Sequence, residues 1–158
     1  MLNMKTRTTL RVLIAAVMVC ASYGAVAEPA TKLELDKYEG QVVVLDFWAS
    51  WCVPCRRSFP WLNAMHAKYS EQGLVIVGVN VDNDPDAAAA FLEDYHAKFL
   101  IHYDTGADLA RHYDIQGMPS SVVIGRDGEI EEIHVGFKVK RQNEYEAVLI
   151  AALNEGVE

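Results

Sequence analysis

The stretch 42–55, VVVLDFWASWCVPC, decides the fold of this chain. From Val42 to Phe47 it is almost continuously apolar and rich in β-branched side chains, which is typical of a central strand buried on both faces of a sheet. A helical pattern begins around Cys52 and runs to about residue 69, with a kink expected at Pro60. The sequence therefore predicts a buried strand that leads into a helix, with Cys52 and Cys55 at the start of that helix.

The Cys-x-x-Cys pair suits reversible disulfide chemistry. The first turn of a helix has free backbone N–H groups and partial positive charge, and both stabilise a thiolate. Cys52 is therefore the predicted nucleophile, and Cys55, one helical turn deeper, can close a disulfide onto it. Pro54 fits this turn because its missing N–H is not needed there.

The spacing of two cysteines alone is compatible with other roles. A structural zinc site needs four ligands, but the histidines that could complete one are scattered along the sequence. They are His66, His96, His102, His112 and His134. A purely structural disulfide across so short a loop would stabilise the fold little, and an inert buried pair suits a helix start poorly. We therefore expect a redox pair, and neither a metal nor a cofactor.

Strands and helices alternate after the redox pair. A second buried strand is predicted at 74–81, and Asp84-Pro85 predicts the N-cap and first turn of a helix. The later signals are a short strand at 99–102, a helix at 105–113, a strand at 121–124, a turn at 126–128, a strand at 130–135 and a closing helix with apolar Tyr145, Val148, Leu149 and Ala152. A short strand is also expected at 33–35. This order predicts an α/β fold with a central mixed β-sheet flanked by helices on both faces.

The N-terminal residues have the pattern of a secretory signal peptide. A basic beginning precedes the wholly apolar run Val12–Cys20, and Ala25-Val-Ala27 provides a small-residue cleavage site. We expect cleavage after Ala27, which would remove Cys20 and leave Cys52 and Cys55 as the pair of cysteines. The working compartment would then lie outside the cytoplasm, where conditions are oxidising.

Two other fates fit this segment less well. An uncleaved membrane anchor would need about 20 apolar residues, more than this segment provides. Lipidation of Cys20 would favour a small residue before it, and Val19 is not small. The predicted organisation is therefore a signal peptide at 1–27, a short tether at 28–32 and one domain at 33–158.

The composition bounds the class of protein. The chain has 158 residues, of which 51% are hydrophobic and 23% charged, as expected for one globular domain. Its formal net charge of −8 and lack of a basic block argue against nucleic-acid binding. We expect a monomer.

The residues 42–55, together with Gly117-Met118-Pro119 before the strand at 121–124, resemble the thioredoxin fold. The FWASWCxPC form, the GQVVVL lead-in and a helix at about 85–98 resemble the TlpA/ResA/CcmG group of extracytoplasmic thiol–disulfide reductases. The resemblance covers about 33–153. It implies a thioredoxin-like fold with a TlpA-type helical insert after the second strand of the βαβ unit.

The resemblance also implies a substrate-binding segment. Met118–Pro119 matches the family's cis-proline bond facing the dithiol, and an X–Pro bond adopts cis at little cost. The backbone beside Met118, preceded by Gly117, would pair with an incoming substrate strand. Trp51 would cover the dithiol and contribute to docking. The alternative for Pro119 is an ordinary proline at a strand entry, and its place between Gly117 and an apolar strand argues against this.

Asp46 interrupts an otherwise apolar strand. An unpaired buried carboxylate is costly, so a raised pKa is expected for Asp46. The resemblance implies that Asp46 accepts the proton of Cys55; the alternative is a carboxylate that faces solvent or is hydrogen-bonded at a sheet face. Some TlpA-like proteins also have a glutamate three residues after the second cysteine, and Ser58 stands there in this chain.

The expected function is that of a periplasmic protein disulfide reductase. Val53 between the cysteines has no positive charge, which favours a reducing pair. The resemblance implies a membrane electron donor of the DsbD/CcdA type and disulfide-containing extracytoplasmic protein substrates, with cytochrome c maturation or copper-site assembly as possible settings. A thiol oxidase, a peroxide reductase and a binding or chaperone module without turnover are the alternatives.

Overall fold

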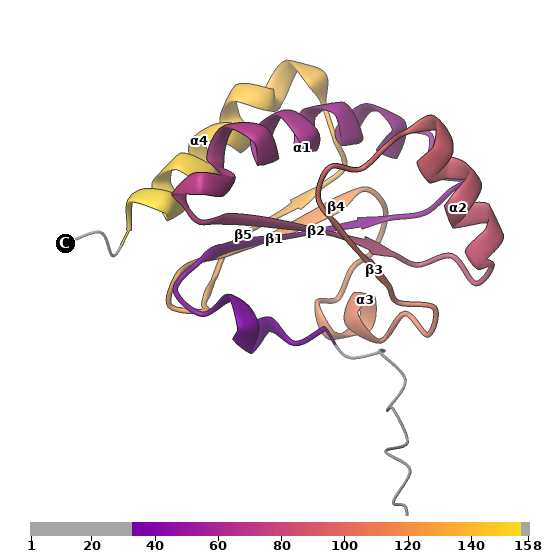
Figure 1. Cartoon of the computed structure of the whole chain (residues 1–158), viewed down its shortest axis with the longest axis horizontal. Helices are drawn as coiled ribbons and strands as arrows, with labels where there is room; N and C mark the ends of the chain where they lie inside the picture. The colour runs from indigo at the N-terminus through magenta and orange to yellow at the C-terminus, as the bar shows by residue number, and fades with distance from the viewer. Residues whose placement is uncertain (1–32, 156–158) are drawn as a thin grey trace, which may run out of the picture.

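The computed structural model describes residues 33–155 and contains one five-stranded mixed sheet (Figure 1). The strand order across the sheet is β3-β2-β1-β4-β5. The strands are β1 (Val42–Trp48), β2 (Leu74–Asn80), β3 (Leu100–Tyr103), β4 (Ser120–Ile124) and β5 (Ile130–Val135). β2 is parallel to β1 and β3, whereas β4 is antiparallel to β1 and β5.

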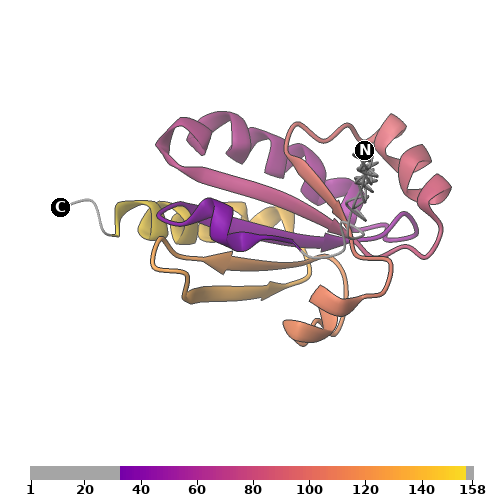
Figure 2. The same ribbon diagram turned by 60° about the horizontal axis from the view of Figure 1, so that its bottom comes forward.

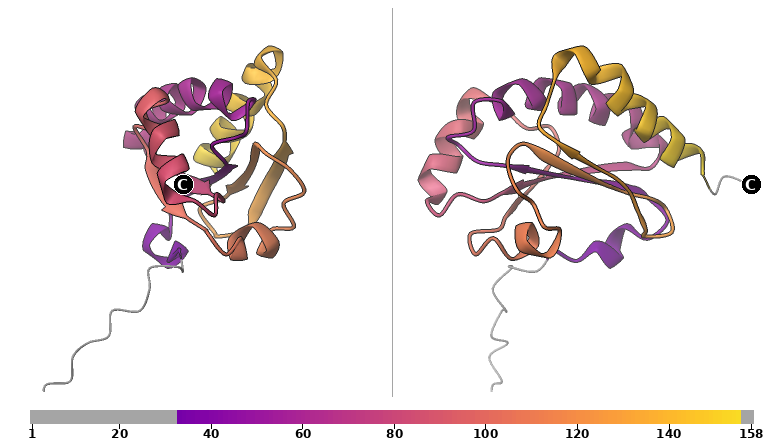
Figure 3. Two further views of the ribbon diagram at one scale, coloured as in Figure 1. Left: turned by 90° about the vertical axis from the view of Figure 1, so that its right-hand side faces the viewer. Right: turned by 180° about the vertical axis from the view of Figure 1, so that it is seen from behind.

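Helices cover both faces of the sheet, as expected. The helices are the 3₁₀ helix η1 (Leu35–Tyr38), α1 (Cys55–Tyr69), η2 (Ser70–Gln72), α2 (Pro85–Asp94), α3 (Asp108–His112), η3 (Val139–Arg141) and α4 (Gln142–Asn154). α1 and α4 lie across one face, and η1 and α3 lie on the other (Figures 1 and 3). The predicted thioredoxin-like fold is confirmed by this order and topology.

β1 is the central strand of the sheet, and all seven of its residues are buried in the core. Its side chains alternate between two hydrophobic clusters, as the two-residue period of a strand requires. Val42, Val44 and Trp48 pack with α1, α2 and α4, whereas Val43, Leu45 and Phe47 pack with α3 and η1. By this alternation Asp46 belongs to the α1 face.

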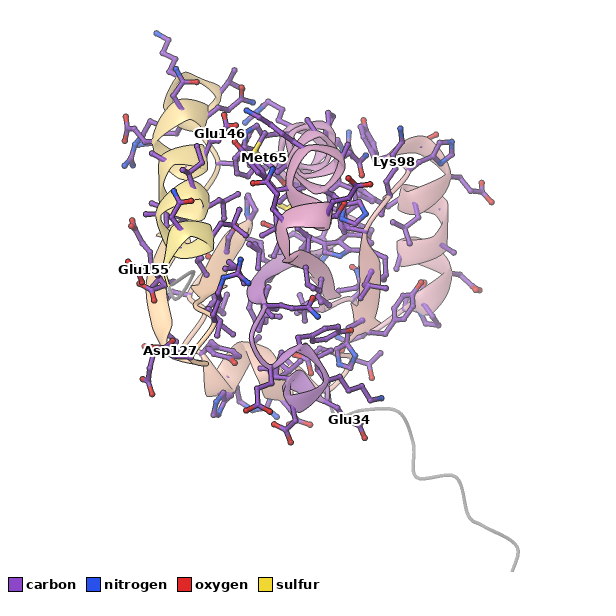
Figure 4. The ribbon with its side chains drawn as sticks, turned by 60° about the vertical axis from the view of Figure 1, so that its left-hand side comes forward. Glu34, Met65, Lys98, Asp127, Glu146 and Glu155 are labelled. Atoms are coloured by element: carbon purple, nitrogen blue, oxygen red, sulfur yellow. A yellow bond between two sulfur atoms is a disulfide. The ribbon has the colours of Figure 1, made fainter. Side chains whose placement is uncertain are left out.

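α1 and α4 are joined by one polar contact on that face. The Lys68 Nζ of α1 lies 2.6 Å from the Glu146 Oε1 of α4, and the Tyr69 hydroxyl donates to the same oxygen at 2.6 Å. Figure 4 shows Glu146 on α4 and Met65 on α1. The pair fixes the two helices side by side over the sheet.

The expected strand at 33–35 was wrong. Its residues instead lead into η1, in which Leu35 and Tyr38 both pack against the α3 face of the core. Side chains three residues apart eclipse in a 3₁₀ helix, so this conformation places both on the sheet, which a strand could not do. Three alternating residues were too short a pattern to distinguish the two.

The other elements lie close to their predicted positions. α1 begins at Cys55 and runs through Pro60 without interruption to Tyr69. α2 begins where Asp84 and Pro85 indicated, and the Asp84 carboxylate accepts from the Asp86 N–H at 3.0 Å. The expected signal peptide and tether lie outside the described residues. Within 33–155, no helix is long and apolar enough to cross a membrane.

Arg126, in the turn between β4 and β5, connects three parts of the chain. Its guanidinium donates to the carbonyl oxygens of Gly40 at 2.7 Å, Gln72 at 2.9 Å and Leu153 at 3.1 Å. The Leu153 carbonyl lies in the last turn of α4, where main-chain oxygens have no partner within the helix. The side chain therefore holds the entries to β1 and β2 against the end of α4. Figure 2 shows the course of the backbone from below.

Arg126→Ala is expected to lower the free energy of unfolding by about 3 kcal/mol, because it leaves three carbonyl groups without their charged donor. Urea unfolding monitored by circular dichroism measures this. Arg57→Ala, which removes an exposed arginine of α1, should change stability by no more than about 0.5 kcal/mol. Equal effects of the two substitutions would contradict the role given to Arg126.

Candidate functional site

Cys52 and Cys55 form a disulfide at the N-terminus of α1, with their Cα atoms 5.4 Å apart. Cys52 lies in the turn after β1, and Cys55 is the first residue of the helix. The Cys55 N–H points back toward Cys52: it lies 3.3 Å from the Cys52 Sγ and 3.1 Å from the Cys52 carbonyl oxygen. A main-chain donor directed at the Cys52 sulfur would stabilise a thiolate there, which supports Cys52 as the nucleophile.

The turn around Cys52 presents apolar surface. Trp51 is 65% exposed and Val53 is 56% exposed, whereas both cysteines are buried. Trp48, by contrast, packs edge-on against Phe59 in the core. Exposed aromatic and aliphatic side chains beside a reactive sulfur are suited to contact with a protein partner. The docking role expected for Trp51 stays a prediction.

A second segment reaches the same edge of the sheet. Phe47, near the end of β1, pairs with Ser120 at the beginning of antiparallel β4, so the turn after β1 and the segment before β4 adjoin. The Met118–Pro119 peptide bond is cis, as the resemblance implied. Met118 packs against the cluster that contains both cysteines. Two segments far apart in sequence thus form one site.

The cis-proline segment is held on both sides. The Ser120 hydroxyl donates to the Gly117 carbonyl oxygen at 2.6 Å. The Gly136 N–H, just after β5, donates to the Pro119 carbonyl oxygen at 2.7 Å. These bonds fix Gly117–Pro119 where an incoming strand could pair with it.

Asp46 is buried, with 1% of its surface exposed. Its Oδ1 accepts from the Ser121 hydroxyl at 2.7 Å, and its Oδ2 has no hydrogen-bond partner among the described residues. Burial raises the pKa of Asp46 to about 7, against the smaller lowering effect of the Ser121 hydrogen bond. The expected raised pKa is thus confirmed. Of the alternatives, the carboxylate does not face solvent, but it is hydrogen-bonded at the sheet face through Ser121. No hydrogen bond within 33–155 links Asp46 to either cysteine.

Ser58 stands where some relatives would have a glutamate. It is buried in α1, and its hydroxyl donates to the Cys55 carbonyl oxygen at 3.1 Å. A hydroxyl satisfied within its own helix supplies no acid–base group to the dithiol. Asp46 is a buried ionisable residue on the face of β1 that packs with Cys55 and α1, and its role toward Cys55 stays a prediction.

A buried polar network behind the redox turn was not anticipated from the sequence. The Asp82 carboxylate accepts from the Ser50 N–H at 2.8 Å, the Ser50 hydroxyl at 2.9 Å and the Asn80 amide at 2.8 Å. The Val81 N–H also donates to the Trp48 carbonyl oxygen at 3.0 Å. This network fixes the residue two before Cys52 to the end of β2. The available signal was a pair of polar residues, Asn80 at the end of the apolar strand β2 and Asp82 two positions later.

Asp82→Ala is expected to lower the free energy of unfolding by about 2 kcal/mol, since one buried and two partly buried donors lose their acceptor. It should also speed hydrogen exchange of the Ser50 amide, which NMR can measure. Asp84→Ala removes an aspartate that caps α2 in an exposed position, so it should cost about 1 kcal/mol and leave Ser50 protected. Unchanged Ser50 exchange in the Asp82 variant would contradict the role assigned to this network.

Within 33–155, no three His, Cys, Asp or Glu side chains gather as a metal site requires. The site is instead built from a helix-capped disulfide, a cis-proline segment and a buried carboxyl group. A thioredoxin-like sheet with these three parts defines a class of redox proteins. The chain belongs to the Redoxin family, whose model matches residues 20–149.

Curated relatives carry the name thiol-disulfide oxidoreductase ResA. The protein from Bacillus anthracis is 34% identical over 113 residues, which are 72% of this chain and 65% of that protein. The Oceanobacillus iheyensis protein is 36% identical over 104 residues, 66% of this chain and 54% of that protein. The chain thus spans about two thirds or less of the length of these relatives.

A solved structure of a related protein is also similar to this chain. A Chlorobium tepidum protein provisionally named thiol:disulfide interchange protein DsbE superposes with a TM-score of 0.74 at 43% identity. The match covers 76% of this chain and 85% of that one. The expected resemblance to the thioredoxin-like ResA group is confirmed by these findings.

Proposed function

We propose that this protein is a thiol–disulfide oxidoreductase that reduces protein disulfides outside the cytoplasm. The observation that carries the proposal is the Cys52–Cys55 disulfide at the N-terminus of α1, adjoining the cis Met118–Pro119 segment. The names of the ResA relatives support thiol–disulfide exchange as the reaction class.

The reaction begins with the reduced protein. The Cys52 thiolate attacks one sulfur of a substrate disulfide, which breaks that bond, forms a mixed disulfide and releases a substrate thiolate that takes a proton from solvent. Asp46 accepts the proton of the Cys55 thiol, directly or through one water. The Cys55 thiolate then attacks the Cys52 sulfur, which closes the protein disulfide and releases the second substrate thiolate. Two electrons pass from the protein to the substrate.

The cis-proline segment holds the substrate during exchange. The main chain at Gly117 and Met118 offers hydrogen bonds to an extended substrate strand, with Pro119 fixing the direction of the segment. Trp51 contacts the same substrate from the redox turn. The apolar exposed surface around Cys52 supports this arrangement, because it is what a protein partner would cover.

The oxidised protein must be reduced again before the next cycle. In an oxidising compartment a membrane protein of the DsbD/CcdA type would supply the electrons, and cytochrome c maturation or copper-site assembly would supply substrates. These assignments rest on the ResA resemblance together with the predicted signal peptide. The periplasm is the proposed location, and residues 33–158 are the proposed working domain, acting as a monomer.

The reduction potential of the Cys52–Cys55 pair tests the direction of the reaction. We expect a value near −270 mV, about that of thioredoxin, by equilibration with glutathione or dithiothreitol. Val53 adds no charge that would stabilise the reduced form further. A value near −120 mV, about that of a strong periplasmic oxidant, would instead identify a thiol oxidase.

A further inference from the structure

The segments around the two sulfurs are basic, although the chain as a whole is acidic. The chain has 22 acidic residues against 14 arginines and lysines. The surface beside the disulfide is formed by the redox turn with the start of α1, by the cis-proline segment and by the link from β5 to α4, which are residues 51–61, 115–121 and 136–143. None of these segments contains an aspartate or a glutamate, and together they contain Arg56, Arg57, Lys138, Lys140 and Arg141.

Two contacts bring the link after β5 to the redox pair. The Gly136 N–H donates to the Pro119 carbonyl oxygen at 2.7 Å, so the chain leaves β5 beside the cis-proline segment. The Phe137 ring then packs against the Trp61 ring of α1, with the two centroids 5.6 Å apart. Lys138 follows directly and is exposed. This part of the chain therefore lies next to both the cis-proline segment and the first turns of α1.

Arg57 adds a positive charge from α1 to the same surface. Trp61 follows four residues later in the helix, and side chains four residues apart lie on the same side of a helix. Arg57 therefore shares the side of α1 on which Trp61 contacts Phe137. Arg56 points elsewhere, because its guanidinium lies over the Tyr95 ring, 5.9 Å from the centroid. Arg57 thus faces the link that follows β5.

Three of these cations have no acidic partner in the part of the chain that the structure describes. Arg57, Lys138 and Lys140 are exposed and form no ion pair within 33–155. Arg141, in contrast, is paired with Glu144 at 2.6 Å. Unpaired cations on one side of a site attract a partner of opposite charge. We call Arg57, Lys138 and Lys140 the basic rim.

The other side of the redox pair has the opposite charge. β2 and β5 lie on opposite sides of β1 in the sheet, so the helix after β2 and the link after β5 flank the redox turn from two directions. Asp84 and Asp86 are exposed at the start of α2. An acidic group on a partner is therefore attracted toward β5 and repelled from α2, which favours one orientation of the partner.

We propose that the basic rim makes this protein prefer protein disulfides that are flanked by acidic residues. This inference deepens the proposed function, on which it rests. The exposed Trp51 and Val53 offer apolar contact to any protein partner, whereas the rim distinguishes partners by their charge. Arg57, Lys138 and Lys140 are thus specificity-determining residues, which act mainly on the rate of association.

The neighbouring surface favours a polypeptide over a membrane as the acidic partner. Trp51 and the cis Met118–Pro119 segment adjoin the rim, and this segment offers main chain with which an extended peptide can pair. A flat anionic bilayer against this end of the molecule would meet the exposed Asp84 and Asp86 as well as the rim. A peptide can place its carboxylates on one side alone.

Matched peptide disulfides test the inference. Three peptides differ only in the two residues that flank the disulfide, which are aspartate, asparagine or lysine, and the rate of mixed-disulfide formation is measured by acid quench and mass spectrometry. At about 10 mM salt, where charges interact over about 30 Å, the aspartate peptide should react about tenfold faster than the asparagine peptide, and the lysine peptide slowest. At about 1 M salt the interaction distance falls to about 3 Å, and the preference should fall to about twofold or less.

Charge-reversal variants connect this preference with the rim. Arg57→Glu, Lys138→Glu and Lys140→Glu should each lower the aspartate-to-asparagine rate ratio by at least about threefold at low salt. A ratio measured on one variant is independent of any change in the reactivity of its Cys52 thiolate, because such a change affects both peptides equally.

Lys98→Glu is the matched control for these variants. Lys98 is exposed, forms no ion pair within 33–155, and precedes β3. Because β3 runs parallel to β2 and β2 to β1, the start of β3 lies at the end of the sheet opposite to Cys52. The substitution changes the net charge by the same amount and should leave the rate ratio within about twofold of wild type.

Two results would overturn the inference while leaving the proposed function intact. One is an equal rate for the aspartate and asparagine peptides at low salt. The other is a preference that all three rim variants keep. Equal rates together with binding to vesicles of phosphatidylglycerol and phosphatidylcholine, lost in the rim variants, would instead assign the rim to a membrane surface. If none of the peptides forms a mixed disulfide with wild-type protein, the proposed function fails, and the inference with it.

Discussion

Cys52→Ser should reduce disulfide exchange by at least about 10⁴-fold, because a serine hydroxyl is not ionised near neutral pH and cannot replace the attacking thiolate. The measurement is the initial rate at which reduced protein releases thiols from a disulfide-linked substrate. Cys52 and Cys55 occupy the buried start of α1, so the fold should be checked by circular dichroism. Retained exchange in this variant would show that Cys52 is not the attacking thiol, whereas retained biological activity without exchange would rule out the redox mechanism and favour a binding module.

Cys55→Ala is the matched control for this result. The Cys52 thiolate is still present, so attack proceeds, but nothing closes the ring and the mixed disulfide accumulates. The trapped adduct can be isolated and the attached protein identified. A protein that attacks with Cys55 instead would give the reverse pattern, with adducts in Cys52→Ser and none in Cys55→Ala.

Asp46→Asn should slow ring closure by roughly 10²-fold, since an amide cannot take the proton of Cys55. In wild-type protein the ring-closure rate should rise with pH through about 7, where the buried carboxyl group ionises. The variant should lose this step, and mixed-disulfide formation should be unaffected. A pH profile that keeps its step near 7 in Asp46→Asn would exclude Asp46 as the acceptor.

The same substitution should stabilise the protein, and the gain should depend on pH. The pKa of Asp46 is about 7 in the folded state and near 3.8 when unfolded, so between these values the folded state holds a proton that the unfolded state has lost. The contribution of Asp46 to stability therefore falls as pH rises from about 4 to about 7, by up to about 4 kcal/mol, and is constant above that. Urea unfolding of wild type and Asp46→Asn across this range measures the difference.

Asp104 is the control for burial alone. It is as enclosed as Asp46, but its carboxylate accepts from the Asp108 N–H at 2.8 Å and the Ala110 N–H at 3.1 Å. Asp104→Asn should therefore destabilise by about 1–2 kcal/mol, because an amide accepts from these donors less well. An equal loss of stability in Asp46→Asn would show that Asp46 is a satisfied structural carboxylate.

Local sequence patterns were sufficient for the main elements and the redox pair. The apolar run of β1, the two cysteines at the start of α1 and the polar interruption at Asp46 are each signals carried by a few neighbouring residues. The 3₁₀ helix η1 was missed because three alternating residues fit a strand equally well. The spacing of three residues that is typical of a 3₁₀ helix is set by Leu35 and Tyr38, which pack on the same face of the core.

The polar contacts between distant strands could not be predicted from the sequence. Asp82 holding Ser50, and Arg126 joining three chain segments, depend on which strand ends share an edge. The Asp46–Ser121 hydrogen bond depends on strand register, because a shift of one residue would move the Ser121 side chain to the opposite face. No pattern in a single sequence fixes the pairing of residues so far apart.

The meeting of two distant segments at one sheet edge has a consequence for the newly made chain. Cys52 and Cys55 lie next to each other in sequence, so they can be oxidised as soon as α1 forms. The segment at Gly117–Pro119 joins them only after β4 has docked against β1, a contact between residues that are far apart along the chain. Under the proposed function, a partly folded molecule would therefore have its pair of sulfurs before the segment proposed to hold a substrate is in place.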